Sequence, residues 1–66
     1  MSRLTVVQTD DNWFEVLTGF NETWVGNVWV NRGTWTAQDF DGDTTDGFET
    51  LLGAAQFCEQ MAAASC

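Results

Sequence analysis

The segment that most constrains the fold is the seven-residue stretch 41–47, Asp-Gly-Asp-Thr-Thr-Asp-Gly, which contains no large apolar side chain. All of its residue types are common in turns. Apolar residues tend to alternate with polar ones before this stretch, and after it they recur every three or four positions. Because the first spacing is typical of strands and the second of helices, we expect a sheet before the stretch and a helix after it.

The first part of the chain is rich in Val, Thr, Trp and Phe, and clusters of turn-forming residues interrupt it. This pattern predicts a meander of three or four antiparallel strands in a sheet at about 3–40. The predicted strands are 3–9, 13–18, 23–30 and 34–40. Turns at 10–12 and 31–33 and a loop at 18–22 would connect them. An alternative is a tight turn at Gly26 and Asn27, which would split the third strand in two.

The last part of the chain has the spacing of one apolar helix face, which predicts a helix over about 47–63. The apolar residues of this face are Phe48, Leu51, Leu52, Ala55, Cys58 and Ala62. Asp46 and Glu49 have the spacing of a capping box, with Asp in place of the usual Ser or Thr. Both acids would also suit the positive end of the helix dipole. Gly53 weakens the helix, and we interpret it as a position of close packing on the sheet.

One sheet and one helix bury their apolar surfaces most economically when the helix lies across one side of the sheet. The sequence therefore predicts an α+β fold in a single domain, 1–66. Its three- or four-stranded antiparallel β-meander would be followed by an acidic loop at 41–47 and by one C-terminal helix packed on one face. The other face of the sheet would stay open.

The tryptophans bear on this open face. Trp24 and Trp29 are an odd number of positions apart, so a regular strand would place them on opposite faces of the sheet. At least one tryptophan is then expected to face solvent. Such a side chain would be either an anchor for a partner or one half of a cross-strand pair that stiffens the sheet.

The charge of the chain is strongly negative, because ten carboxylates face only Arg3 and Arg32, with no Lys and no His, for a formal net charge of -8. Disordered acidic chains are poor in aromatic residues, whereas this chain has four Trp and five Phe. We therefore interpret the charge as the surface of a folded domain. It favours a basic protein partner and disfavours direct contact with nucleic acid or a membrane. Without a secretion signal or an apolar span, we expect a cytoplasmic protein.

Catalytic chemistry has few candidate residues, because His, Lys and Tyr are all missing. We expect no enzyme, no cofactor and no metal. The run 39–46 resembles a calcium loop, but an EF-hand needs Gly at its sixth position and Glu at its twelfth. Counted from Asp39, those positions hold Thr44 and Thr50, so an EF-hand is rejected and only non-standard calcium binding stays open as an alternative. Cys58 is interpreted as a buried, inert thiol on the apolar face of the helix.

The acidic run has a second interpretation. In an extended chain Asp39, Asp41 and Asp43 would project one way at intervals of about 6.6 Å, twice the rise of a strand and similar to the spacing of phosphates. With Asp46 and Glu49 they would form a line of charge that fits a groove built for DNA or RNA. The alternative is a solvated loop that keeps the protein soluble. The predicted partner-binding residues are Asp39, Asp41, Asp43, Asp46, Glu49 and Trp29.

The chain is similar to small phage-encoded inhibitors of bacterial defence, of the anti-CRISPR and anti-restriction type. The similarity lies in its acids from Asp39 to Glu49, its short length and its order of strands followed by a helix. This resemblance implies that the protein covers the nucleic-acid site of a CRISPR effector or a restriction complex, as a mimic of DNA or RNA. The layout also resembles the DNA-binding arm domains of phage integrases. Their sheet is basic, however, so the two arginines here argue against direct DNA binding.

The competing functional hypothesis is a small assembly or structural protein of a phage or bacterium. In that case the Trp-bearing face of the sheet would associate with a second copy or with another subunit. The protein would then be a homodimer if the face pairs with a second copy, and otherwise a monomer.

Overall fold

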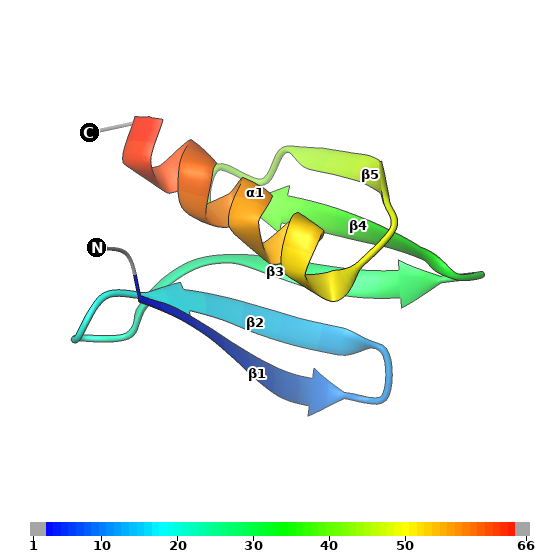
Figure 1. Ribbon diagram of the computed structural model, residues 1–66, viewed down its shortest axis with the longest axis horizontal. Coiled ribbons are helices and arrows are strands. Elements are labelled where there is room, and N and C mark those ends of the chain that lie inside the picture. The colour runs from blue at the N-terminus through cyan, green and yellow to red at the C-terminus, as the bar shows by residue number, and fades with distance from the viewer. Residues whose placement is uncertain (1–2, 65–66) are drawn as a thin grey trace.

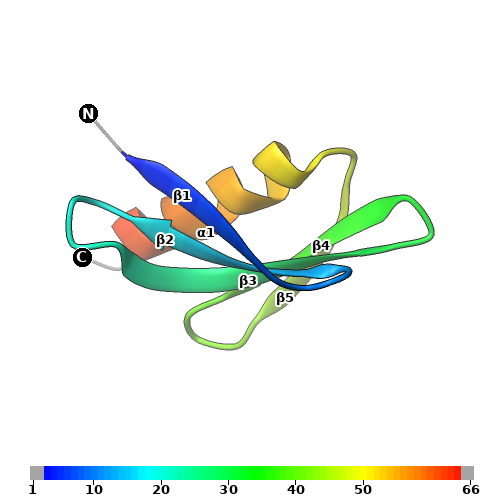
Figure 2. The same ribbon diagram turned by 90° about the horizontal axis from the view of Figure 1, so that it is seen from below.

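The computed structural model describes residues 3–64, which form a five-stranded antiparallel sheet followed by one helix (Figure 1). The strands are β1 (Leu4–Asp10), β2 (Trp13–Thr18), β3 (Thr23–Asn31), β4 (Thr34–Asp39) and β5 (Thr44–Phe48), and the helix is α1 (Leu51–Ala64). Each strand pairs with the next one along the chain. α1 lies along one side of the sheet and contacts mainly β3 and β4 (Figure 2). The α+β fold, with an antiparallel meander and a helix on one face, is confirmed.

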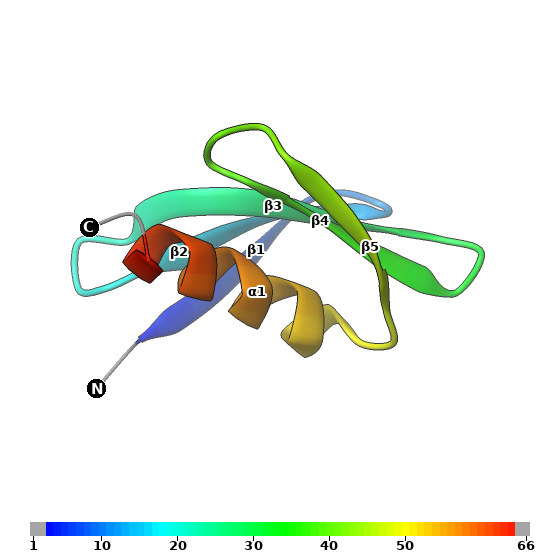
Figure 3. The ribbon, with the colours of Figure 1, turned by 90° about the horizontal axis from the view of Figure 1, so that it is seen from above.

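The prediction of a loop over 41–47 is wrong in its second half, because Thr44–Phe48 forms β5 along the free edge of β4. Two β-branched threonines suit the start of a strand. The end of the strand is held by Phe48, whose ring packs against Phe57 of α1 with 5.4 Å between centroids. The sheet therefore has a fifth strand, and a short connection of Glu49 and Thr50 joins this strand to α1 (Figure 3).

The start of the helix also differs from the prediction. α1 begins at Leu51, and the side-chain Oγ1 of Thr50 accepts a hydrogen bond from the backbone N–H of Gly53 at 3.0 Å. A threonine that accepts from the third helical residue is an ordinary N-cap. The predicted capping box is wrong, because Asp46 lies inside β5 and the first turn of α1 contains no acid.

The core lies between α1 and the face of the sheet that α1 covers, and its members are small or β-branched. The buried apolar residues are Val16, Val25, Val28, Ala37, Ala54, Ala55 and Cys58. Sheet and helix pack closely at Gly26, where a Cβ atom would stand 2.7 Å from the Cys58 Sγ and would also clash with the backbone oxygen of Gln38. Gly26, and not Gly53 as predicted, is therefore the glycine of close packing: a Cβ on Gly53 would meet chiefly the Oγ1 of Thr50, at 3.2 Å.

The apolar face of α1 is rotated slightly from its predicted position. Ala54, Ala55 and Cys58 are fully buried, whereas Leu52 is 57% exposed. The rotation follows from the contact at Gly26, because it centres Cys58 on the sheet and turns Leu52 toward solvent. The prediction that Leu52 belongs to the core is wrong.

A β-bulge in β3 decides which way its tryptophans face. Val16 pairs with Gly26 and the next residue of β2, Leu17, pairs with Trp24, so Val25 is an extra residue on β3. The extra residue reverses the alternation and places Trp24 on the same face as Trp29. The prediction of opposite faces is therefore wrong. The alternative tight turn at Gly26 and Asn27 is not formed, since β3 runs unbroken from Thr23 to Asn31.

Candidate partner-binding surface

The face of the sheet away from α1 carries three tryptophans, which we call the tryptophan face: Trp13, Trp24 and Trp29. Trp13 and Trp29 are cross-strand partners, and their rings stack with centroids 4.5 Å apart and planes inclined by 2°. Trp13 is 38% exposed and Trp24 is 42% exposed. The sequence prediction named Trp29 alone; the structure places it beside two further tryptophans, because the bulge at Val25 keeps Trp24 on this side.

Polar groups hold the tryptophan face in one arrangement. The indole N–H of Trp24 donates to the side-chain oxygen of Asn27 at 3.2 Å, which fixes the ring on its own strand. The stacked pair of Trp13 and Trp29 holds β2 against β3 in the same way. An aromatic surface that is already ordered loses little conformational entropy when a partner covers it.

The fourth tryptophan does not belong to this surface. Trp35 lies in β4 in register with Val30 and Phe48, on the side that α1 covers. Its ring makes a tilted contact with Phe14, with 5.5 Å between centroids. Trp35 is thus part of the core packing.

Asp39, the first residue of the predicted acidic line, is buried with 2% of its surface exposed. Its Oδ1 accepts the backbone N–H groups of Asp41 at 3.0 Å and of Asp43 at 3.1 Å. The backbone closes the same turn, because the N–H of Asp39 donates to the carbonyl of Asp43 and the N–H of Gly42 donates to the carbonyl of Asp39. Asp39 therefore organises the β4–β5 turn. The prediction that its carboxylate faces outward is wrong.

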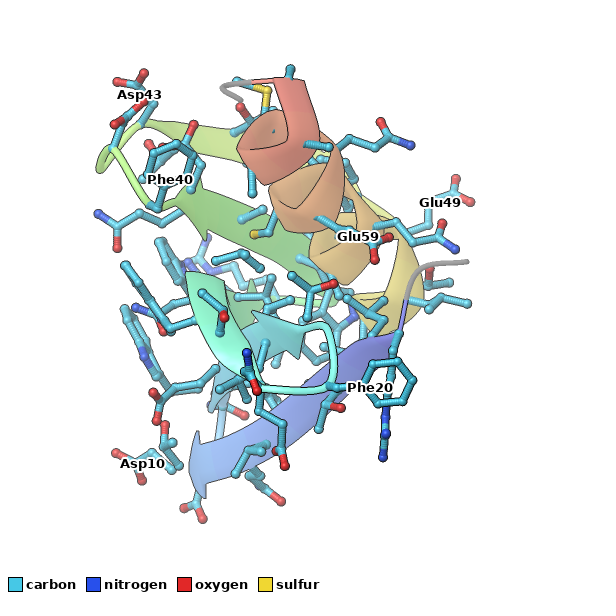
Figure 4. The ribbon with its side chains drawn as sticks, turned by 90° about the vertical axis from the view of Figure 1, so that its left-hand side faces the viewer. Asp10, Phe20, Phe40, Asp43, Glu49 and Glu59 are labelled. Atoms are coloured by element: carbon cyan, nitrogen blue, oxygen red, sulfur yellow. The ribbon has the colours of Figure 1, made fainter. Side chains whose placement is uncertain are left out.

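The remaining acids of the predicted line do not lie in one row. Asp41 and Asp43 are exposed in the β4–β5 turn, and we call this pair the acidic tip. Asp46 is exposed on β5, and Glu49 is exposed just before α1. Asp43 and Glu49 lie on opposite sides of the molecule in Figure 4. The predicted line breaks because the chain turns back at 40–43 instead of staying extended.

A second acidic turn lies next to the stacked indoles. It was predicted only as a connection between two strands. Asp10 ends β1 and Asp11 follows it, and both are exposed. An open recess at this end of the sheet is lined by Asp10, Asp11, Asn12, Trp13, Trp29, Val30 and Asn31. We call it the turn recess. In the sequence, the only sign of this recess is that an Asp-Asp-Asn turn directly precedes Trp13. Trp29 joins the lining because it pairs with Trp13 across the sheet.

The buried thiol of Cys58 has no catalytic arrangement. Burial, and then the charge of Asp39, raise the pKa of Cys58 to about 11. Its Sγ donates weakly to the carbonyl oxygens of Gln38 at 3.6 Å and of Asn27 at 3.9 Å. The thiol is therefore protonated at neutral pH and is a poor nucleophile. Cys66, the other thiol of the sequence, lies outside the described residues.

Within residues 3–64, no three His, Cys, Asp or Glu side chains gather closely enough to hold a metal ion. No helix in the described part of the chain is long and apolar enough to cross a bilayer. In comparisons with known proteins, no protein-family model, curated protein or solved structure matches the chain.

Proposed function

We propose that this chain is a non-enzymatic binding protein: an acidic inhibitor that blocks a basic nucleic-acid-binding surface of a host defence complex, such as a CRISPR effector or a restriction complex. The observation that carries the proposal is the exposure of the charge, since seven of the ten carboxylates are exposed and only two arginines oppose the ten. The exposed acids are Asp10, Asp11, Glu22, Asp41, Asp43, Asp46 and Glu49. A surface of this kind attracts basic protein and repels nucleic acid.

The geometry changes which acids the proposal assigns to contact. The acidic tip supplies two carboxylates on an ordered turn, where Asp39 holds the backbone from inside. Because Asp39 itself is buried, it supports the tip and takes no part in contact. Asp46 and Glu49 extend the charge along the edge of the sheet and toward the start of α1. The protein would therefore mimic nucleic acid with separate charged turns, and not with one row of carboxylates at the spacing of phosphates.

The tryptophan face supplies the apolar part of the proposed contact. Charge alone gives fast but salt-sensitive association, whereas buried aromatic side chains carry much of the affinity of protein interfaces. Trp13 and Trp24 are exposed, and Trp29 is half-buried behind Trp13. A partner that covers this face would remove the three indoles from water while its basic residues meet the acids at the rim.

The experiment is capture of the partner from the native host cell, followed by measurement of its Kd at salt concentrations from about 50 to about 200 mM. The Asp41→Asn/Asp43→Asn variant should bind more weakly and with a shallower salt dependence. The control is Glu22→Gln/Glu59→Gln, which removes the same charge away from the acidic tip and should weaken binding less. An affinity that does not change with salt would refute the inhibitor proposal, and an equal loss in both variants would refute the assignment of contact to the acidic tip.

The second candidate function is assembly through the tryptophan face, as a small structural protein of a phage or bacterium. It is favoured by the exposure of Trp13, Trp24 and Val7, which the strand registers place on the face away from α1. Covering of this face by another copy would make the sedimentation coefficient increase with concentration. A monomer at every concentration would exclude self-association.

A further inference from the structure

We propose that the turn recess binds an arginine side chain of the basic partner. The inference rests on the proposed function for the existence of that partner. The recess combines two kinds of wall at one end of the sheet: the stacked indoles of Trp13 and Trp29, and the acidic residues Asp10 and Asp11 of the β1–β2 turn. Asn12, Val30 and Asn31 complete the lining.

An arginine fits both walls at once. Its guanidinium group is planar and delocalised, so it stacks on aromatic rings, and its five N–H donors pair with carboxylate and amide oxygens. A lysine ammonium is more strongly hydrated and has no plane with which to stack. A metal ion is a poor match, because no group of three or more ligating side chains converges among residues 3–64 and an indole offers no ligand atom.

The acidic wall is ordered before any ligand arrives. The Oδ1 of Asp10 accepts the backbone N–H of Asp11 at 2.8 Å, which leaves the other carboxyl oxygen of Asp10 for a ligand. The side chain of Gln8 donates to the carbonyl of Asp11 at 3.2 Å, and the hydroxyl of Thr9 donates to the carbonyl of Trp13 at 3.2 Å. Asp10 points away from the helix side of the molecule in Figure 4. These bonds pre-organise the β1–β2 turn and reduce the entropy that binding must remove.

Arg32 is the like charge closest in sequence to the recess. It follows Asn31 in the β3–β4 turn, where its φ is 55°, and it is not among the residues that line the recess. The recess is thus open to an external guanidinium, which Arg32 would weakly repel. Removal of the Arg32 charge should therefore raise the affinity for an arginine ligand, whereas a substitution that damages the structure would lower it.

The probe for the test is the peptide acetyl-Gly-Arg-Gly-amide, added to the full ¹⁵N-labelled chain while the indole N–H resonances are followed by NMR. Trp13→Phe and Trp29→Phe variants assign their two signals. We expect saturable shifts of both signals, with little shift of the Trp24 signal. The peptide with citrulline in place of arginine is nearly the same shape without charge, and its binding should be weaker by about fivefold or more.

Variants locate the site. Asp10→Asn/Asp11→Asn should weaken binding of the arginine peptide by about fivefold or more, and Arg32→Gln should strengthen it by about twofold. Asp41→Asn/Asp43→Asn carries the same charge change at the acidic tip and should bind the peptide nearly as the wild type does. Unshifted indole signals would overturn the inference, as would equal binding of the citrulline peptide or equal loss in the two acidic variants.

The two proposals fail in different ways. If the arginine peptide binds the recess and no basic protein is captured from the host, the proposed function is lost and the recess remains. If a basic protein is captured with salt-sensitive affinity and Asp10→Asn/Asp11→Asn leaves both its binding and the peptide signals unchanged, the recess is refuted and the function stands.

Discussion

The two faces of the sheet are built from different side chains. On the face covered by α1, the contact is made by small residues, since Gly26, Ala37, Ala54, Ala55 and Cys58 meet there at close range. The open face carries indoles, of which two stack on each other and one is fixed by an asparagine. Close packing of helix on sheet tolerates no extra atoms, whereas an open face can display large rings. We therefore attribute folding stability mainly to the covered face, and we propose the open face for partner binding.

The strongest test of this division is Gly26→Ala, which adds one methyl group to the covered face. Its Cβ would clash with the Cys58 Sγ and the Gln38 backbone oxygen, so we expect a loss of about 3 kcal/mol in the free energy of unfolding. In a chain this small that is a large share of the total. Thermal and urea unfolding measure it.

Gly53→Ala is the matched control, because its added Cβ would meet only the Thr50 hydroxyl at 3.2 Å and the Phe48 ring at 3.9 Å, and Ala favours the helix. It should leave stability unchanged or increase it. Cys58→Ala in the Gly26→Ala background should recover part of the loss. Equal stability of Gly26→Ala and the wild type would contradict the close contact.

The next effect in size is expected for Asp39→Ala. The substitution leaves the N–H groups of Asp41 and Asp43 without their charged acceptor, and about 2 kcal/mol of unfolding free energy should be lost. Asp41→Ala removes the same charge from an exposed position and should change stability by about 0.5 kcal/mol or less. If the two variants are equally stable, the carboxylate of Asp39 does not hold the turn.

An effect of similar size should appear at alkaline pH. The pKa of Cys58 is about 11 in the fold against an ordinary value of 9.0, so folding favours the protonated thiol. The resulting stabilisation is complete below about pH 9 and is lost as the pH rises toward 11, at up to about 1.4 kcal/mol per pH unit. Without Lys and Tyr, few other groups titrate in this window.

Urea unfolding of a Cys66→Ser variant from pH 8 to pH 11 measures this loss, with Cys58→Ala in the same background as control. The free energy of unfolding of this control should fall less as the pH rises. If the free energy of unfolding falls equally with pH in both variants, the Cys58 thiol is not buried beneath α1.

The smallest effect on folding is expected on the open face. Trp24→Phe removes the indole N–H bond to Asn27 but keeps an aromatic ring at an exposed position, so the free energy of unfolding should fall by about 0.5 kcal/mol or less. Urea unfolding again gives the value. A loss comparable to that of Gly26→Ala would show that the tryptophan face stabilises the fold as much as the core does.

Local patterns were sufficient to predict the first four strands, the helix and its packing on one face of the sheet, because two- and three-to-four-residue spacings are properties of neighbouring residues. β5 was missed since Thr44 and Thr45 are embedded among turn-forming residues, and their strand forms only against β4. The bulge at Val25 leaves no mark in composition, although it decides the face of Trp24.

The candidate site was less predictable for the same reason. Asp39 has the sequence surroundings of a solvated loop, and only the closed turn shows that its carboxylate is turned inward. The turn recess joins Asp10 and Asp11 to Trp29, which lies on another strand, so it depends on the strand register. The inhibitor function and the partner class remain proposals that rest on exposed charge.

We propose that the open face of the sheet binds the partner and that the covered side stabilises the fold, and two Kd values test this division. Trp24→Ser and Leu52→Ser each remove one exposed apolar side chain, the first from the tryptophan face and the second from the outer surface of α1. With the basic partner captured from the host, Trp24→Ser should weaken binding by about tenfold or more, and Leu52→Ser should leave the Kd unchanged. Equal Kd values for the two variants, or a greater loss with Leu52→Ser, would contradict the claim.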